Sequence, residues 1–224
     1  MYFKEPNLVF IHIPKTAGTS IRKALTGHSL FTFLHKDWHL SGEQFLDRSR
    51  DRPLDRETKF FSVIRNTYER MVSLYLHTCR GKNKDQAFNF GSFLSEVNNS
   101  KHKHTASQLY WISDRIKGAC CSWREHKPSC CWCEYNNMGD TFHPSHQYDD
   151  TKSDLVFRFE ELDTVEKFLQ ENICKGITLP RLNVNKGSTI HYSEYYTKET
   201  RRIVRRMYAQ EIDRFNFKFE EPNG

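Results

Sequence analysis

A strand, a short polar turn and a helix follow one another near the start of the chain. Residues 7–13 read NLVFIHI, a β-branched and aromatic run that predicts a buried strand ending at Pro14. The turn reads PKTAGT, and TSIRKALTG after it has apolar residues at helical spacing and stops at Gly27. Such a unit restricts the chain to folds in which strands alternate with helices.

The same alternation continues along the chain. KFFSVI (59–64) and DLVFRF (154–159) predict further strands. Helices are predicted over residues 66–79, 90–99, 105–116, 163–173 with Asp163 as its cap, and about 193–214, and Ser41 with Gln44 three residues later predicts the capped start of a short helix. We therefore expect an α/β, P-loop-like three-layer fold with a mainly parallel central sheet flanked by helices.

Length and composition favour one water-soluble domain over residues 1–224. The mean hydropathy is −0.76, and no window approaches the roughly 20 apolar residues that a membrane helix needs. As it stands, the chain is expected to be cytoplasmic and to have no membrane segment. Its net charge of +6 and pI of about 8.9 favour an anionic partner, whether nucleic acid, nucleotide or acidic polysaccharide.

The cysteines are unevenly distributed. Five of the seven fall within residues 120–133, inside an irregular insertion at about 117–153. Cys130 and Cys133 have the C-x-x-C spacing of a zinc or redox pair, but no second such pair follows. A structural zinc, one or two disulfides and reduced thiols all remain open, and we favour the last two.

The turn after the first strand has the composition of an anion site. The first N–H groups of a helix have no intrahelical partner and carry roughly half a positive charge. A lysine, a glycine that permits close approach and three hydroxyl side chains surround that point. The predicted anion-binding residues are Lys15, Thr16, Ala17, Gly18, Thr19 and Ser20.

This turn differs from the common nucleotide-binding loops. A Walker loop places its lysine after the last glycine, whereas Lys15 comes three residues before Gly18. There is also no G-x-G-x-x-G, which disfavours a dinucleotide fold.

A second segment repeats the pattern. FFSVIRNTYERMVSLY runs from a strand to Arg65 at its carboxyl end and then into a helix, with Ser73 eight residues after the arginine. In a doubly wound sheet, ligands bind beyond the carboxyl ends of the strands. Arg65 and Ser73 are therefore expected to hold a second phosphate in the same crevice as Lys15.

Together these segments resemble the sulfotransferases that use 3′-phosphoadenosine-5′-phosphosulfate (PAPS). IPKTAGTS resembles their 5′-phosphosulfate loop, and VIRNTYERMVSLY their 3′-phosphate element, usually R-[DN]-P-x-x-R-x-x-S, with Thr67 where proline is usual. DLVFRFEEL and LPRLNVNKGS match more loosely. The carbohydrate branch, of the heparan sulfate 2-O-sulfotransferase type with its small microbial relatives, is the most similar.

The resemblance implies a chemistry and an acceptor. PAPS would be the sulfuryl donor, no metal would be required, and the acceptor would be a hydroxyl, most simply that of a carbohydrate. Lys15 would steady the leaving oxygen, and Lys186 would close over the nucleotide. His39 matches a histidine of H-x-H-V-S and would be the general base, with Asp37 in place of the first histidine. This branch also implies a Golgi lumen location if the chain is a fragment of a longer anchored protein.

Other interpretations remain to be compared with this one. His35, His77 and Glu43 are reserve bases, and His12 is interpreted as a core histidine. An atypical P-loop kinase or nucleotidase would need an acidic metal ligand at a strand end, where this chain has Arg65. A nucleic-acid-binding module is supported only by the pI, so nucleic acid is not an expected partner. The four arginines at 201, 202, 205 and 206 are interpreted as the solvent face of the last helix, although a polyanion could use them.

Overall fold

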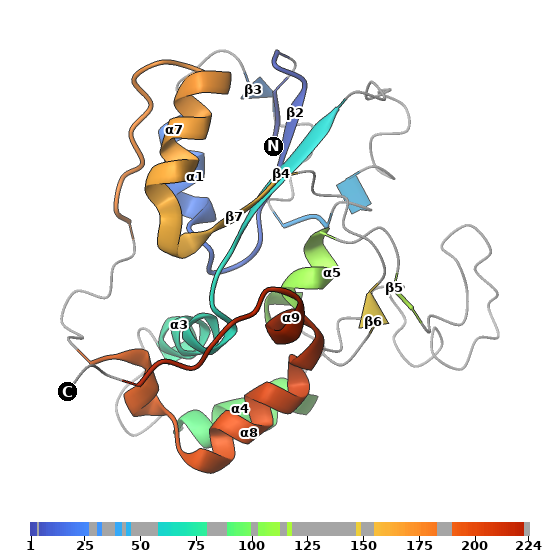
Figure 1. Ribbon diagram of the computed structural model, residues 1–224, viewed down its shortest axis with the longest axis vertical. Coiled ribbons are helices and arrows are strands. Elements are labelled where there is room, and N and C mark those ends of the chain that lie inside the picture. The colour runs from blue at the N-terminus through green and yellow to red at the C-terminus, as the bar shows by residue number, and fades with distance from the viewer. Residues whose placement is uncertain are drawn as a thin grey trace.

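The fold is a mixed α/β structure built on a twisted central sheet (Figure 1). The computed structural model describes residues 1–3, 5–26, 31–32, 39–41, 44–45, 58–79, 89–99, 103–112, 116–117, 147–148, 155–182 and 190–221. Within these ranges the main sheet has five strands in the order β3-β1-β2-β4-β7.

The three longest strands of this sheet are parallel. β2 (Leu8–Ile11), β4 (Lys59–Ile64) and β7 (Leu155–Arg158) pair in that order. The predicted mainly parallel sheet is therefore confirmed for its centre. Two short strands, β1 (Tyr2–Phe3) and β3 (Phe31–Thr32), extend one edge antiparallel. At two residues each, they are too short to leave a periodic signal in the sequence.

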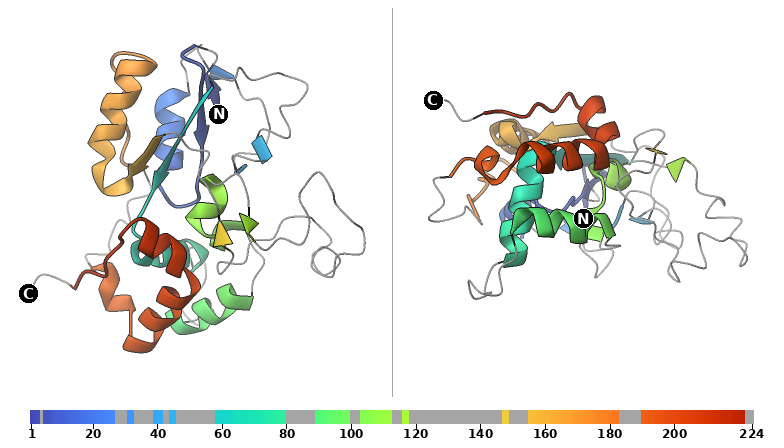
Figure 2. Two further views of the ribbon diagram at one scale, coloured as in Figure 1. Left: turned by 45° about the vertical axis from the view of Figure 1, so that its right-hand side comes forward. Right: turned by 90° about the horizontal axis from the view of Figure 1, so that it is seen from below.

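Both faces of the sheet are buried, as the apolar runs predict. On β2, Leu8 and Phe10 belong to one hydrophobic cluster, and Val9 and Ile11 belong to another. This division follows the two-residue period of a strand. The first cluster packs the sheet against α1 (Gly18–Leu25) and α7 (Leu162–Asn172), which lie side by side in Figures 1 and 2.

The remaining longer helices of the described ranges gather beyond the carboxyl ends of the strands. They are α3 (Thr67–Cys79), α4 (Phe90–Asn99), α5 (Gln108–Ile112), α8 (Lys198–Met207) and α9 (Ala209–Arg214). The second cluster joins their apolar faces to the other face of the sheet. The predicted flanking helices are thus present, but this second group lies largely below the sheet in Figure 1.

Several helix boundaries differ from the predicted ones. The single helix predicted over about 193–214 is a 3₁₀ turn (Tyr192–Tyr195) followed by α8 and α9, which meet at Tyr208. Buried Tyr208 donates a hydrogen bond to the Thr105 carbonyl at 2.6 Å, and its backbone leaves the helical region there (φ −116°, ψ 29°). A tertiary contact therefore interrupts a continuous helical pattern.

The starts of two other helices, α7 and α5, also differ from the predicted ones. Asp163 does not cap α7. A 3₁₀ turn (Phe159–Glu161) leads directly into the helix, so Asp163 already lies in its first turn. Of the helix predicted over 105–116, the described residues form α5, preceded by a 3₁₀ turn (Lys103–Thr105), and residues 113–115 lie outside the described ranges. The predicted cap at Ser41 is confirmed, since its side chain accepts from the Gln44 N–H while Gln44 Oε1 accepts from the Ser41 N–H.

A two-stranded ribbon forms a second, separate sheet. In it β5 (Ile116–Lys117) pairs antiparallel with β6 (Gln147–Tyr148), and most of the insertion predicted at about 117–153 lies outside the described residues. The five clustered cysteines lie outside the described residues. Cys79 and Cys174, which are described, are free thiols.

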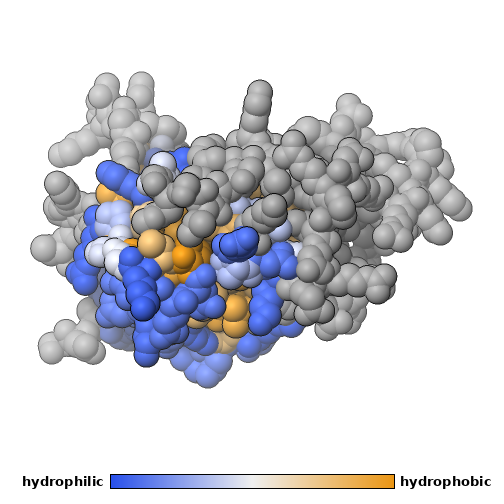
Figure 3. Space-filling view, turned by 90° about the horizontal axis from the view of Figure 1, so that it is seen from above, coloured by the Kyte–Doolittle hydropathy of each residue, from blue (hydrophilic) through white to orange (hydrophobic). Residues whose placement is uncertain are grey.

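The described surface is mostly polar, as the composition predicts. In the view from above (Figure 3), hydrophilic side chains surround a central group of hydrophobic ones. Within the described ranges, Ile190 is the one large hydrophobic residue that is exposed. No helix in these ranges is both long enough and apolar enough to cross a membrane.

A buried carboxylate ties the helices below the sheet together. Glu211 of α9 is fully buried and accepts hydrogen bonds at 2.6 Å from the hydroxyls of Thr67 and Ser107. It also accepts from the N–H and the side-chain amide of Gln108 at 2.6 and 3.2 Å. One residue thus joins the starts of α3 and α5 to α9. Thr67, which stands where proline is usual in the resembling motif, contributes one of these bonds.

We predict that Glu211→Ala lowers the free energy of unfolding by about 3 kcal/mol, because four buried donors lose their acceptor together. Urea denaturation measures this change. Glu96→Ala, which removes an exposed carboxylate from α4, is the matched control and should change stability by less than about 0.5 kcal/mol. Equal effects of the two substitutions would contradict the role given to Glu211.

Candidate active site

The loop between β2 and α1 has an unusual backbone. Lys15 and Ala17 have φ angles of 71° and 65°, in the left-handed region that non-glycine residues rarely adopt. Each costs roughly 1–2 kcal/mol relative to a right-handed conformation. Strain of this kind is concentrated at functional sites, and alternating right- and left-handed residues turn successive N–H groups toward one point.

That point has the donors an anion needs. The Ser20 and Ile21 N–H groups donate to the Ala17 carbonyl and so begin the bonding of α1. For the N–H groups of Thr16, Ala17, Gly18 and Thr19, the described part of the chain offers no hydrogen-bond acceptor. The start of α1 also has no acidic residue in its first turn. The loop is therefore suited to hold a negatively charged group.

The hydroxyl groups of the loop are not all available to such a group. Thr16 is fully buried and its hydroxyl, which was predicted to donate to the anion, donates here to the Ile13 carbonyl at 3.0 Å. The Ser20 hydroxyl accepts a long bond from the Leu182 N–H at 3.4 Å. Thr19 is half-buried. Backbone groups therefore dominate the site.

Gly18 is needed for a reason that the sequence did not reveal. A Cβ atom at this position would lie 1.7 Å from His12 Cδ2, so the His12 ring packs directly on the glycine. His12 is the predicted core histidine. Burial, above all, lowers its pKa well below 6.5, and nearby His39 adds to the effect. His12 is consequently neutral at pH 7.

His39 packs against His12, which in turn packs on Gly18 of the loop. The two imidazole rings are 4.3 Å apart between centroids, and the His104 ring packs edge-on to His39 at 4.9 Å. His39 Nδ1 is 3.1 Å from the His12 carbonyl oxygen, which can only accept a hydrogen bond. Nδ1 therefore carries a proton and donates to this carbonyl, which fixes the orientation of the His39 ring.

Arg65 approaches the same loop from β4. Its Nη1 donates to the Lys15 carbonyl at 3.3 Å, and its Nη2 pairs with Glu69 at 2.5 Å. The guanidinium also lies over the Phe159 ring, 4.1 Å from its centroid, and its Nε is buried without a hydrogen bond. The two predicted phosphate-binding elements thus meet in one place.

Two further residues fix this meeting point. The Gln108 side chain accepts from the Arg65 N–H and donates to the Arg65 carbonyl, each at 2.8 Å, and is itself held by Glu211. Fully buried Arg70 donates to the Pro14 carbonyl at 3.3 Å, and to the His104 and Ala106 carbonyls at 3.1 and 2.8 Å. Arg70 therefore joins the loop to the turn before α5.

Some predicted residues are not brought to this point. Ser73 is half-buried on α3, and no hydrogen bond in the described residues joins it to Arg65. His77 is exposed in the last turn of α3. Lys186 lies outside the described residues, as do His35, Asp37 and Glu43.

Comparison with known proteins identifies the family. The sequence profile of the Sulfotransferase family matches residues 1–218. The chain belongs to this family. No curated protein and no solved structure is similar enough to be counted as a match. The match covers the loop, Arg65 and the last helices, so family membership applies to the whole of the candidate site.

Sequence reasoning about this family member missed four residues of the site. Arg70 occupies the second arginine position of the resembling R-[DN]-P-x-x-R-x-x-S motif, and that position was the available signal. Glu211 stands four residues after Met207 on the buried stripe of the last helix, where an acid is unexpected. His104 and Gln108 gave no comparable signal, because only tertiary packing brings them to the loop.

We predict that Gly18→Ala lowers the free energy of unfolding by about 2 kcal/mol, because the new methyl group meets the His12 ring. Gly91→Ala on α4 is the control: there an added Cβ lies 3.3 Å from its nearest neighbour, so the change should stay within about 1 kcal/mol.

The double variant Gly18→Ala with His12→Ala gives the decisive comparison. Removing the His12 ring should recover most of the loss caused by Gly18→Ala, which appears as a coupling free energy in urea denaturation. Additive effects would show that the two residues do not make the close contact described.

Proposed function

We propose that the chain is a PAPS-dependent sulfotransferase that moves a sulfuryl group to a hydroxyl acceptor, most simply on a carbohydrate. The observation that carries this proposal is the hydrogen bond from Arg65 to the Lys15 carbonyl. Because the 5′-phosphosulfate loop and the 3′-phosphate arginine lie side by side, one nucleotide with phosphates at both ends can reach both.

The residues present fit a doubly phosphorylated nucleotide. Four N–H groups of the loop make no hydrogen bond to the described backbone, and Arg65 supplies a delocalised cation whose buried Nε has no partner. Arginine and converging backbone N–H groups are the preferred donors for phosphate. PAPS, when bound there, supplies a sulfuryl group on a good leaving oxygen.

His39 is the proposed general base. Its Nδ1–H donates to the His12 carbonyl, which orients the ring, and Nε2 is the ring atom that would take the proton of the acceptor hydroxyl as that oxygen bonds to sulfur. The bond from sulfur to the phosphate oxygen breaks in the same transfer. His12 remains neutral because its pKa is lowered, so it does not oppose the charge that develops on His39.

Lys15 is the proposed electrostatic partner of the leaving oxygen. It belongs to the left-handed part of the loop, and its carbonyl accepts the hydrogen bond from Arg65. A cation held there stabilises the negative charge that the phosphate gains during transfer. The carbohydrate part of the proposal is supported by the resemblance of the two motifs to the carbohydrate branch.

Nucleotide selectivity tests the donor. We predict that 3′-phosphoadenosine-5′-phosphate (PAP) raises the melting temperature strongly, whereas ATP with Mg²⁺ at the same concentration raises it much less. An equal response to the two nucleotides would favour the kinase or nucleotidase interpretation and contradict the proposal.

Substitution of two histidines, one at a time, tests which residue is the general base. We predict that His39→Ala reduces sulfuryl transfer from PAPS at least 100-fold while leaving the Kd for PAP unchanged. His77→Ala removes an exposed histidine from α3 and should retain turnover. Full activity of the His39 variant would remove this residue from the base role.

The Arg65–Glu69 pair makes a further prediction. Glu69 occupies the anion position on Arg65 that a phosphate would take. Glu69→Gln should therefore tighten PAP binding about two- to fivefold, which corresponds to the modest strength of a partly exposed ion pair. Glu171→Gln, from the remote Lys167–Glu171 pair on α7, should leave the Kd unchanged. Weaker PAP binding by the Glu69 variant would contradict competition between carboxylate and phosphate.

A further inference from the structure

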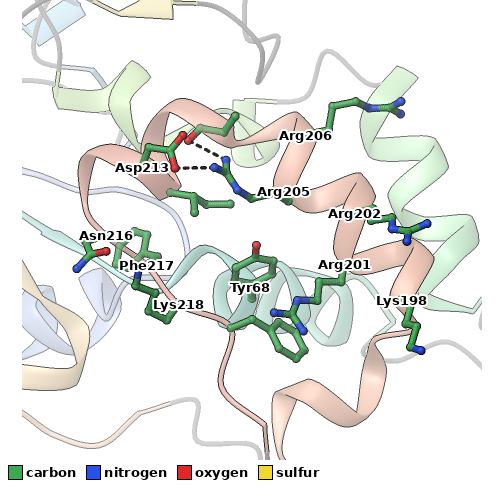
Figure 4. A pocket seen from close by; sticks show the side chains of 13 residues that line it. Tyr68, Lys198, Arg201, Arg202, Arg205, Arg206, Asp213, Asn216, Phe217 and Lys218 are labelled. Carbon is green, nitrogen blue, oxygen red and sulfur yellow. Dashed lines mark hydrogen bonds and ion pairs between the residues drawn. The ribbon is translucent and has the colours of Figure 1, made fainter.

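A basic groove runs along α8, outside the loop and Arg65 (Figure 4). We call it the α8 groove. It encloses about 960 Å³ between α8 and residues 216–219, with Tyr68 of α3 at its floor. Six cationic side chains line it: Lys198, Arg201, Arg202, Arg205, Arg206 and Lys218.

The charge of the groove is strongly unbalanced. Asp213 is the one acidic residue of its lining, so the groove carries a net charge of about +5, close to the +6 of the whole chain. Arg205 pairs with Asp213 at 2.6 Å, and Arg201 pairs with Glu221 at 3.2 Å. Within the described residues, the other four cations of the groove form no ion pair. An anionic partner would therefore gain several contacts without displacing a carboxylate.

The cations are arranged in rows. Lys198, Arg202 and Arg206 follow one another at four-residue intervals along α8, and Arg201 and Arg205 form a second row toward the 216–219 segment (Figure 4). Four helical residues rise about 6 Å, so the first row spans about 12 Å. A linear polymer with repeating negative groups fits this spacing better than a single small anion.

The aromatic side chains at the floor of the groove indicate which class of anionic polymer fits it. Tyr68 and Phe217 are buried, and Phe219 has the Arg201 guanidinium over its ring at 4.2 Å and the Tyr68 ring edge-on at 5.1 Å. No aromatic face in this lining is open for stacking. Single-stranded nucleic acid is bound through exposed aromatic faces on which bases stack. A polymer recognised through its charged groups alone fits the groove better.

The groove is connected to the candidate site. Asn66, directly after Arg65, donates from its side-chain amide to the Lys218 carbonyl at 2.7 Å. Tyr68, at the floor, lies in the first turn of α3, which begins two residues after Arg65. A polymer lying along α8 would therefore pass near the nucleotide side of the molecule.

We propose that the α8 groove binds a linear acidic polysaccharide, whose carboxylate or sulfate groups pair with the two rows of cations. Arginine suits this role because its planar fork bonds such groups in a bidentate manner. Docking requires no sulfuryl transfer, so the proposal stands independently of the reaction proposed above.

Direct binding tests the groove. Dextran sulfate and polygalacturonate are titrated into the full chain at about 150 mM salt, with neutral dextran and oligothymidylate as comparison polymers. Arg202→Gln with Arg206→Gln should weaken binding of both acidic polysaccharides at least tenfold, and should reduce the slope of log K against log salt by about 2.

The control carries the same change of charge elsewhere. Lys167→Gln with Lys175→Gln removes two exposed cations near α7 and should retain affinity within about twofold. Equal losses in the two double variants would show that only the net charge matters and would overturn the proposal. Tighter binding of oligothymidylate than of either polysaccharide, or no saturable binding by the unmodified chain, would also overturn it.

Two readouts separate failure of the groove from other failures. PAP binding should be unchanged in the arginine double variant. Loss of PAP binding there would show general damage to the fold, and the location of the polymer is then decided by acylation of lysines in the unmodified chain. In the unmodified chain, dextran sulfate should protect Lys198 and Lys218 from amine acylation and leave Lys167 and Lys175 reactive. Equal protection of all four lysines would contradict the assigned location. Neither readout requires PAPS turnover.

Discussion

The parallel pairing of β2 with β4 is the constraint on which the rest of the structure depends. In this register Ile11 lies opposite Ser62, so both strands end at the same edge of the sheet and the chain then leads into Pro14 on one side and Arg65 on the other. The loop before α1 and the arginine before α3 therefore converge through backbone geometry alone. The hydrogen bond from Arg65 to the Lys15 carbonyl is a consequence of this register.

Buried charges then hold the convergence in place. Arg70 bridges the loop and the turn before α5 through three carbonyl oxygens, and Glu211 collects donors from the starts of α3 and α5. Burying either charge is costly unless its hydrogen bonds are made, so these contacts favour one arrangement of the segments over alternatives. The strained backbone at Lys15 and Ala17 is supported by this frame.

The sequence predicted the parts of this account that depend on local pattern. Strand β4 and helix α4 match their predicted ranges, and the loop and Arg65 were expected in one crevice. The sequence could not predict the break at Tyr208, because a hydrogen bond to Thr105, about a hundred residues away, causes it. Nor could it predict that Gly18 accommodates the His12 ring or that Thr16 turns its hydroxyl inward. These features depend on packing between segments, which a local pattern does not encode.

The central claim is that the loop and Arg65 hold two phosphates of one nucleotide. Calorimetric titration of PAP, adenosine 3′-monophosphate and adenosine 5′-monophosphate into the unmodified chain and Arg65→Gln tests it most directly. The account predicts that the substitution weakens binding of PAP and the 3′-monophosphate at least tenfold and leaves the 5′-monophosphate unaffected. An equal loss for all three ligands, or a loss confined to the 5′-monophosphate, would contradict it.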